Sequence, residues 1–132
     1  MFPSPDQEFA WAIGLFEGEG SAGVYGNGKN KHVIAQVKMR LIDKDTVERF
    51  HIAVGVGRLQ NENHAAKNTI MYGWTLTRQA DLLMLAQKMY PYLSKRRQAQ
   101  LDPVIEFCKL RLETPSRSRS RWNKFYHTEG KV

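Results

Sequence analysis

The chain of 132 residues is 42% apolar, 25% charged and 11% aromatic, which suits one globular domain with its own core and is too short for two. Its 20 basic and 13 acidic side chains leave a formal net charge of +7, so nucleic acid is the first partner to test and an anionic membrane the second. A single cysteine, Cys108, excludes an intramolecular disulfide and a multi-cysteine zinc site, and the lack of a long apolar run or a secretory signal predicts an intracellular protein without a membrane span.

The first predicted element is a helix that begins near the N-terminus. Segment 4–7 reads Ser-Pro-Asp-Gln, which combines an N-cap serine, a proline at the first helical position and a glutamine three residues after the cap. Residues 9–16 are apolar nearly all round, and we therefore expect this helix to be buried on several sides. Gly18 and Gly20 end it.

A hairpin follows this helix. From Ser21 the apolar residues recur at every second position, which predicts a strand with Ala22 and Val24 on one face. A loop of turn residues, 26–31, separates this strand from a second one, 32–40. The apolar face of the second strand consists of Val33, Ala35, Val37 and Met39.

The central part of the chain predicts a further helix and a second hairpin. The helix is capped by Asp43 or Asp45, runs to about Ala53 and is stopped by the glycines that follow. The hairpin pairs segment 58–63 with segment 69–76 around a polar tip. Its inward-facing residues are Leu59, Ile70, Tyr72, Trp74 and Leu76.

The C-terminal part predicts two helices and a tail. Thr77 caps a helix over 78–90, and a last helical region covers 95–112. The Asp-Pro pair at 102–103 either kinks that region or restarts it, because aspartate is a good cap and proline a good first residue. Residues 114–132 carry an Arg-Ser repeat, and we expect them to form a basic, partly flexible tail.

The order of these elements defines the fold class. Two antiparallel hairpins with helices on one face make an α+β domain, αββαββα over residues 1–113, with a single four-stranded antiparallel sheet. The opposite face of that sheet is expected to be polar, basic and open.

Two glutamates lie at the C-terminal end of the first helix. A helix C-terminus carries partial negative charge, so an exposed carboxylate there is disfavoured by roughly 0.3–1 kcal/mol. Glu17 and Glu19 therefore indicate a bound cation, and Mg²⁺ takes the carboxylate and carbonyl oxygens that this position supplies. On these residues alone, solvated side chains just beyond the helix end are an equally good interpretation.

The surroundings of the two glutamates carry a family resemblance. Segment 11–21 reads Trp-Ala-Ile-Gly-Leu-Phe-Glu-Gly-Glu-Gly-Ser and resembles the signature of the LAGLIDADG homing endonucleases. Glu17 and Glu19 stand where the signature has two aspartates. The predicted order of elements is that of the family, and segments 54–57 and 91–99 also look like those of its members. The residues that match the signature letter for letter are Gly14, Leu15 and Gly20.

The resemblance implies a homodimer. In the family two signature helices pack against each other through small residues, and this chain has one copy of the signature, so the second helix must come from a second chain. Gly14 and Gly18, four residues apart, lie on one helical face and let two backbones approach. The two sheets then form a saddle along double-stranded DNA. The residues expected at the dimer interface are Trp11, Gly14, Leu15 and Gly18.

The resemblance also implies a metal-dependent cleavage site. Glu19 would bind the divalent ion, Mg²⁺ or Mn²⁺, together with the backbone carbonyl of Gly18. The family has aspartate at the position of Glu19, and glutamate is one methylene longer. Lys95 best matches the basic residue that the family places near the scissile phosphate, and Arg96 is the alternative. A solvated helix start is the plain interpretation of this basic run.

The outer face of the sheet is expected to bind DNA. Arginine, lysine, asparagine and glutamine read base edges in the major groove, which a two-stranded ribbon can enter. A solvated polar surface is the alternative. The residues expected to contact DNA are Tyr25, Asn27, His32, Gln36, Lys38, Arg40, Arg58, Gln60, Arg96 and Arg97.

The sequence therefore predicts a site-specific DNA endonuclease, a homing endonuclease that acts as a homodimer on a near-palindromic target. The alternative is a member of the family that has lost cleavage and acts as an RNA maturase or a DNA-binding regulator. A basic scaffold protein is the third hypothesis. Glu19 favours the enzyme, because a protein that only binds DNA has no need for a carboxylate beside phosphates.

Overall fold

The helices and strands follow the order expected from the sequence. The computed structural model describes residues 3–64 and 69–113. Short 3-10 turns, η1 (Gly28–Asn30), η2 (Leu41–Asp43) and η4 (Tyr90–Tyr92), connect the longer elements. These are α1 (Pro5–Glu19), β1 (Gly20–Tyr25), β2 (His32–Arg40), α2 (Lys44–Val54), β3 (Arg58–His64), β4 (Thr69–Leu76), α3 (Gln79–Met89) and α4 (Lys95–Glu113).

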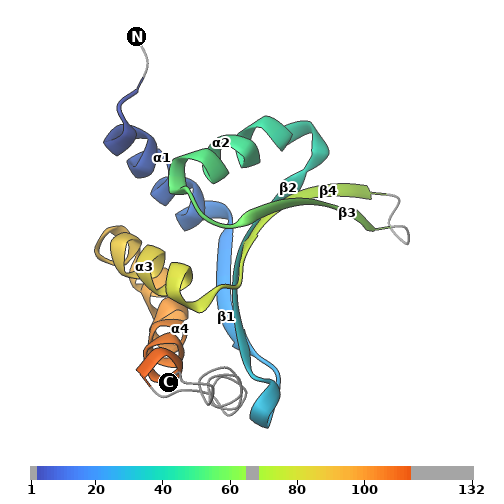
Figure 1. Ribbon diagram of the computed structural model, residues 1–132. Coiled ribbons are helices and arrows are strands. Elements are labelled where there is room, and N and C mark those ends of the chain that lie inside the picture. Colours follow the sequence, from blue (N-terminus) through green and yellow to red (C-terminus); the bar gives the residue numbers. More distant parts are fainter. Residues whose placement is uncertain (1–2, 65–68, 114–132) are drawn as a thin grey trace, which may run out of the picture.

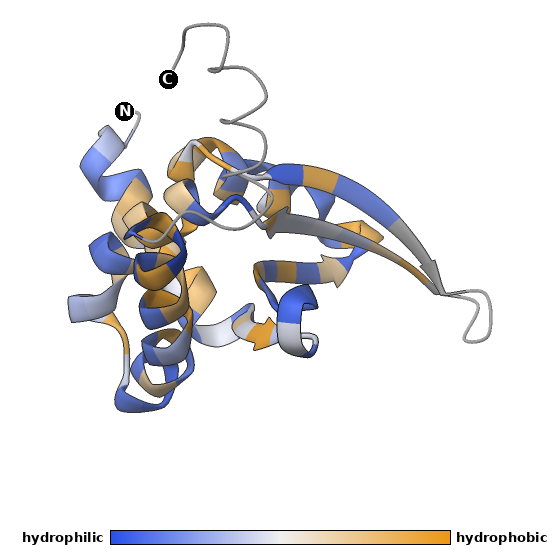
Figure 2. Ribbon diagram, turned by 60° about the horizontal axis from the view of Figure 1, so that its bottom comes forward, coloured by the Kyte–Doolittle hydropathy of each residue, from blue (hydrophilic) through white to orange (hydrophobic). Residues whose placement is uncertain are grey.

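The four strands form one antiparallel sheet in the order β1-β2-β4-β3, which confirms the α+β fold class. The sheet bends, so that the β1–β2 and β3–β4 hairpins project in different directions (Figure 1). The described helices lie on its convex side, and its concave side is open (Figure 1). Hydrophobic and hydrophilic stretches alternate along the strands (Figure 2), as expected for a sheet with one face buried and one exposed.

The core lies between the convex side of the sheet and the helices. Trp74 of β4 is fully buried, and its ring meets that of Phe50 edge-on at a centroid distance of 4.8 Å. The Trp74 indole Nε1 donates a hydrogen bond to the Val56 carbonyl at 2.8 Å, so the buried N–H is satisfied. Gly57 has φ +93°, and a Cβ there would lie 2.3 Å from Trp74 Nε1, which explains the glycine.

Helix α1 begins with the predicted capping box. The Gln7 N–H donates to Ser4 Oγ at 3.2 Å, and the Ser4 N–H donates to Gln7 Oε1 at 2.8 Å. At its other end a Cβ on Gly20 would lie 2.3 Å from the Phe16 ring, so the step from helix to strand needs a glycine there. The buried residues of α1 are Ala12, Ile13 and Phe16.

Helix α1 packs on several sides, against α2, β1 and β2, and the side that carries Gly14 and Gly18 is exposed in the single chain. Two predictions about single residues need correction. Ile70 lies opposite Asn63 near the hairpin tip and is 47% exposed. Helix α3 begins at Gln79, so Thr77 lies before the helix and does not cap it.

Helix α4 is one element that includes Pro103, so the helical region does not restart at Asp102. Asp102 Oδ1 accepts a hydrogen bond from the Tyr90 hydroxyl at 2.7 Å. The predicted tail, 114–132, lies outside the described residues. Within the described residues, no helix is both long enough and apolar enough to cross a membrane.

Candidate nucleic-acid interface and acidic centre

The concave side of the sheet carries a row of polar side chains, which we call the outer face. In β2, Gln36 and Lys38 alternate with the buried Ala35 and Val37, so they point away from the core. This face also carries Ile34 and Met71, and its polar residues on the three strands β2, β3 and β4 include Gln36, Lys38, Arg40, Arg58, Gln60 and Thr75.

Strand register brings the predicted DNA-contact residues together in rows. Gln36 lies opposite Thr75, and Thr75 lies opposite Arg58, whose Nε donates to Thr75 Oγ1 at 3.4 Å. In the next row Lys38 and Gln60 flank Gly73. A Cβ on Gly73 would lie 3.2 Å from the Cγ of Lys38, so the lysine stem crosses the glycine. The two rows place arginine, lysine and two glutamines on one surface.

The tip of the β1–β2 hairpin extends this surface. Tyr25 pairs with His32 across the hairpin, with ring centroids 6.2 Å apart. The predicted contact residue Asn27 is exposed in the connecting loop. Lys29 and Lys31 are exposed in the same loop and add positive charge beside the strands. The sequence analysis did not include these two lysines among the predicted DNA contacts. Their position in a loop between two strands that are expected to bind DNA could have indicated them.

The two glutamates at the end of α1 have different environments. Glu17 Oε1 accepts the Ser94 N–H at 2.8 Å, and Glu17 Oε2 accepts the Ser94 hydroxyl at 2.7 Å. These hydrogen bonds, the backbone one first, lower the pKa of Glu17, and the charges of Arg97 and Arg96 lower it further. Both carboxylate oxygens of Glu17 therefore hold the start of α4.

Glu19, by contrast, is exposed at the last position of α1. Its carboxylate makes no hydrogen bond or ion pair with another described residue. The Gly18 carbonyl lies in the last turn, where helix carbonyls lack partners within the helix. Both groups are hard oxygen ligands that suit a divalent ion. Within residues 3–64 and 69–113, no group of three or more His, Cys, Asp or Glu side chains could hold a metal ion.

The basic run at the start of α4 divides into exposed and buried residues. Lys95 and Arg96 are exposed, as a DNA-contact role requires. Arg97 is only 6% exposed: its Nε donates to the Glu17 carbonyl at 2.8 Å and its Nη1 donates to Gln100 Oε1 at 2.9 Å. The prediction that Arg97 contacts DNA is therefore corrected, because its guanidinium joins α4 to α1 in the interior.

The predicted dimer face is open at its glycines. Around Gly14 and Gly18 no atom outside their own helix backbone and chain neighbours lies within 4 Å of an added Cβ. Trp11 and Leu15 are half-buried against the core, and the Trp11 ring lies 3.8 Å from the Arg49 guanidinium carbon. The geometry of a single chain thus leaves the glycine face free and directs Trp11 toward α2.

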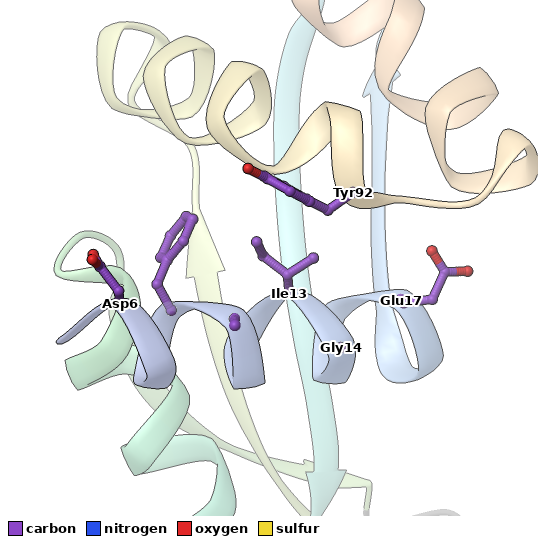
Figure 3. A pocket seen from close by; sticks show the side chains of 7 residues that line it. Asp6, Ile13, Gly14, Glu17 and Tyr92 are labelled. Atoms are coloured by element: carbon purple, nitrogen blue, oxygen red, sulfur yellow. The ribbon is translucent and has the colours of Figure 1, made fainter. Parts of the chain in front are cut away.

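An open pocket runs along α1 beside the glycine face. Figure 3 shows Tyr92 of η4 lying across from Ile13 of α1, with Glu17 at the far end. Tyr92 is 73% exposed, and it was not among the site residues predicted from the sequence. The residues that line the pocket are Asp6, Phe9, Ala10, Ile13, Gly14, Glu17 and Tyr92.

Comparison with solved structures defines the class of fold. The homing endonuclease I-CvuI in complex with DNA superposes with a TM-score of 0.65 at 19% identity, over 80% of this chain and 68% of that one. The LAGLIDADG homing endonuclease I-GzeII, bound to its DNA target, gives 0.64 at 18% identity, over 92% of this chain and 41% of its own. The archaeal intron-encoded I-Vdi141I, complexed with DNA, gives 0.66 at 15% identity, over 83% and 72%.

The chain therefore has the fold of the LAGLIDADG homing endonucleases, which confirms the fold implied by segment 11–21. It spans less than half the length of I-GzeII. No protein-family model matches the sequence, and no curated protein matches it either.

Proposed function

We propose that the protein is a site-specific double-stranded DNA endonuclease, a homing enzyme that works as a homodimer with a divalent metal, Mg²⁺ or Mn²⁺. The observation that carries the proposal is the position of the exposed Glu19 at the step from α1 to the sheet whose open outer face is polar and basic. The DNA-bound homing endonucleases of the same fold support it. Intron homing, by analogy with the intron-encoded I-Vdi141I, belongs to the same proposal.

The outer face would provide recognition of the target. Arg58 can donate two hydrogen bonds to a guanine edge, and Gln36 can exchange a donor and an acceptor with adenine. Lys29, Lys31 and Arg40 are exposed at the margins of this face, where they suit phosphate contacts that fix the register of the protein on the duplex. Recognition and positioning would thus be divided between strand residues and flanking cations.

A second copy of the chain would complete the site. The open glycine face of α1 allows the close approach of an identical helix, and a two-fold axis between the helices would bring two copies of Glu19 together. The two sheets would then form one continuous saddle on the duplex. A symmetric dimer reads a target whose two halves repeat, so the proposed target is near-palindromic.

Glu19 and its surroundings at the end of α1, which we call the acidic centre, would catalyse the hydrolysis. Glu19 and the Gly18 carbonyl would hold the divalent ion, which when bound supplies charge neutralisation at the scissile phosphate and activation of water. Lys95, exposed in the first turn of α4, would donate a hydrogen bond to a phosphate oxygen and stabilise the charge that develops there.

A cleavage selection tests this proposal. The protein is incubated with a randomised duplex library and Mg²⁺, and the cut ends are sequenced. Glu19→Gln removes one charge with little change in volume, and Glu106→Gln removes the same charge from an exposed site on α4. We expect the wild-type protein and Glu106→Gln to enrich one target, and Glu19→Gln to bind that target with equal or slightly higher affinity without cutting it.

Two results would contradict the proposal. If the wild-type protein yields no enriched cut ends, it is not a nuclease, and retained sequence-specific binding would point to a regulator. If Glu19→Gln cuts as fast as the wild-type protein, the catalytic acid lies elsewhere.

A further inference from the structure

The end of α1 and the start of α4 are joined by hydrogen bonds between residues 77 apart in the sequence. Glu17 accepts from Ser94 twice, through Oε1 at 2.8 Å and through Oε2 at 2.7 Å. Ser94 immediately precedes α4, so the Glu17 carboxylate lies at the positive end of that helix, where negative charge is stabilised. The carboxylate at the end of α1 therefore balances the partial positive charge at the start of α4.

A second connection runs in the same place. The buried Arg97 donates from Nε to the Glu17 carbonyl at 2.8 Å, and its own N–H donates to Ser94 Oγ at 3.3 Å. Gln100 Oε1 accepts from Arg97 Nη1 at 2.9 Å and holds the guanidinium in this orientation. Glu17 is thus bound both by its carboxylate and by its main chain.

Ser94 and Arg97, which make these contacts, flank the two exposed basic residues in the sequence. Lys95 and Arg96 lie between Ser94 and Arg97, and Glu19 lies two residues beyond Glu17. The side chains of Lys95 and Arg96 make no hydrogen bond within the described residues, so the α4 backbone sets where each side chain begins. Glu17 is hydrogen-bonded to Ser94, just before Lys95, and to Arg97, just after Arg96. These bonds therefore also influence how Lys95 and Arg96 lie relative to Glu19.

We infer that Glu17, Ser94 and Arg97 form a positioning clamp that fixes Lys95 and Arg96 relative to the end of α1, which carries Glu19, for phosphodiester cleavage. This inference rests on the proposed nuclease function. The three residues touch neither DNA nor metal in it, and they act by fixing the basic residues that do. The role of Glu17 then differs from that of Glu19, although the two glutamates are neighbours in one motif.

The other end of α1 supplies a matched control. Glu8 is tied to Arg49 of α2 by two hydrogen bonds, of 2.9 and 2.6 Å. It lies about 16 Å from Glu19 along the helix at 1.5 Å per residue. Glu8→Gln removes the same charge and the same kind of helix-to-helix contact as Glu17→Gln, but far from the basic pair.

The test compares Glu17→Gln, Ser94→Ala and Glu8→Gln with the wild-type protein on its selected target. We expect Glu17→Gln and Ser94→Ala to lower the single-turnover cleavage rate at saturating DNA by about 10- to 100-fold, since small misplacements of reacting groups have effects of that size. The dissociation constant for DNA should change by less than about threefold. Ser94→Thr keeps the hydroxyl and should restore the rate, and Glu8→Gln should lower only the melting temperature.

Amide hydrogen exchange provides a readout independent of cleavage. Glu17→Gln should accelerate exchange at the amides of Ser94 and Arg97, which donate to Glu17 Oε1 and Ser94 Oγ, relative to the end of α4, and Glu8→Gln should not. Equal cleavage rates for the wild-type protein and Glu17→Gln would overturn the positioning role while leaving the nuclease proposal intact, as would equal rate losses in Glu17→Gln and Glu8→Gln. A wild-type protein that cuts no target would refute the proposed function and the clamp's role with it, and unchanged exchange would refute the clamp.

Discussion

The two faces of the sheet differ although they are made by the same strands. On the inner face Val37 and Trp74 have no exposed surface, whereas on the outer face Gln36 and Arg58 remain accessible. Successive residues of a strand point to opposite faces, so Gln36 and Val37 are chain neighbours with unrelated surroundings. The inner face holds the fold together, and the outer face carries the polar side chains that are proposed to read the target.

Helices α1 and α4 repeat this division. Phe16 is buried against the sheet, while Gly14 on the same helix has open space around it. Arg97 is buried next to the exposed Arg96. Neighbouring substitutions in any of these elements should therefore have different consequences, and the following experiments are designed to break or sharpen that contrast.

The largest effect is expected on the inner face. Trp74→Ala should lower the free energy of unfolding by about 3–5 kcal/mol, because it removes a fully buried ring and its contact with Phe50. Gln36→Ala, on the outer face, should change it by no more than about 0.5 kcal/mol. Urea denaturation of both variants measures the contrast, and similar midpoints would show that the two faces contribute equally to stability.

The next effect concerns the open face of α1. Gly14→Leu adds a large side chain where two helices are proposed to meet, and we expect it to raise the dimer dissociation constant by about 100-fold, or roughly 2.7 kcal/mol. The monomer should stay folded, since the added Cβ meets no atom within 4 Å. Sedimentation velocity checks this, and a wild-type protein that is monomeric both free and on DNA would contradict it.

A smaller contrast is expected between Arg97 and Arg96. Arg97→Met leaves the Glu17 carbonyl and Gln100 without their donor and should cost about 1–3 kcal/mol of folding free energy. Arg96→Met should leave stability nearly unchanged and reduce the salt slope of DNA binding by about one unit. Denaturation and salt titrations distinguish the two, and an equal loss of salt slope in both variants would place Arg97 at the DNA.

The smallest effect is a pH dependence at Glu17. Its hydrogen bonds with Ser94 hold the pKa of the folded state below the ordinary value of 4.5, so its contribution to stability is present above that pH and is lost as the pH falls through the folded-state pKa. The difference in melting temperature between the wild-type protein and Glu17→Gln should therefore shrink from pH 7 to pH 3. A difference that stays constant over this range would show that the carboxylate charge is not involved.

Local patterns in the sequence were sufficient to predict most of the fold. The period of two in β2 identifies Val33, Ala35 and Val37 as core residues, and the capping box at Ser4 marks the start of α1. The exposure of Ile70 was not predictable in this way, because alternation tells which face a residue occupies but not how far the helices cover that face.

The candidate site was less predictable, because its contacts join distant segments. Nothing near Glu17 in the sequence indicates that Ser94 and Arg97 will bind it, since they follow it by 77 and 80 residues. A run such as Lys95-Arg96-Arg97 is uniformly basic in the sequence, and only the tertiary structure decides which of the three residues is buried. The resemblance of segment 11–21 to a family signature supplied the position of Glu19, which residue chemistry alone left open.

The central claim is that the outer face of the sheet reads the DNA sequence, and a binding-site selection from a randomised duplex library tests it most directly. The wild-type protein is compared with Gln36→Ala, Arg58→Ala and Lys109→Ala, the last of which removes a positive charge from an exposed position on α4. We predict that Gln36→Ala and Arg58→Ala each relax the preference at particular base pairs by about 1–3 kcal/mol, while Lys109→Ala keeps the wild-type profile. Selection profiles that are the same for all four proteins would contradict the claim.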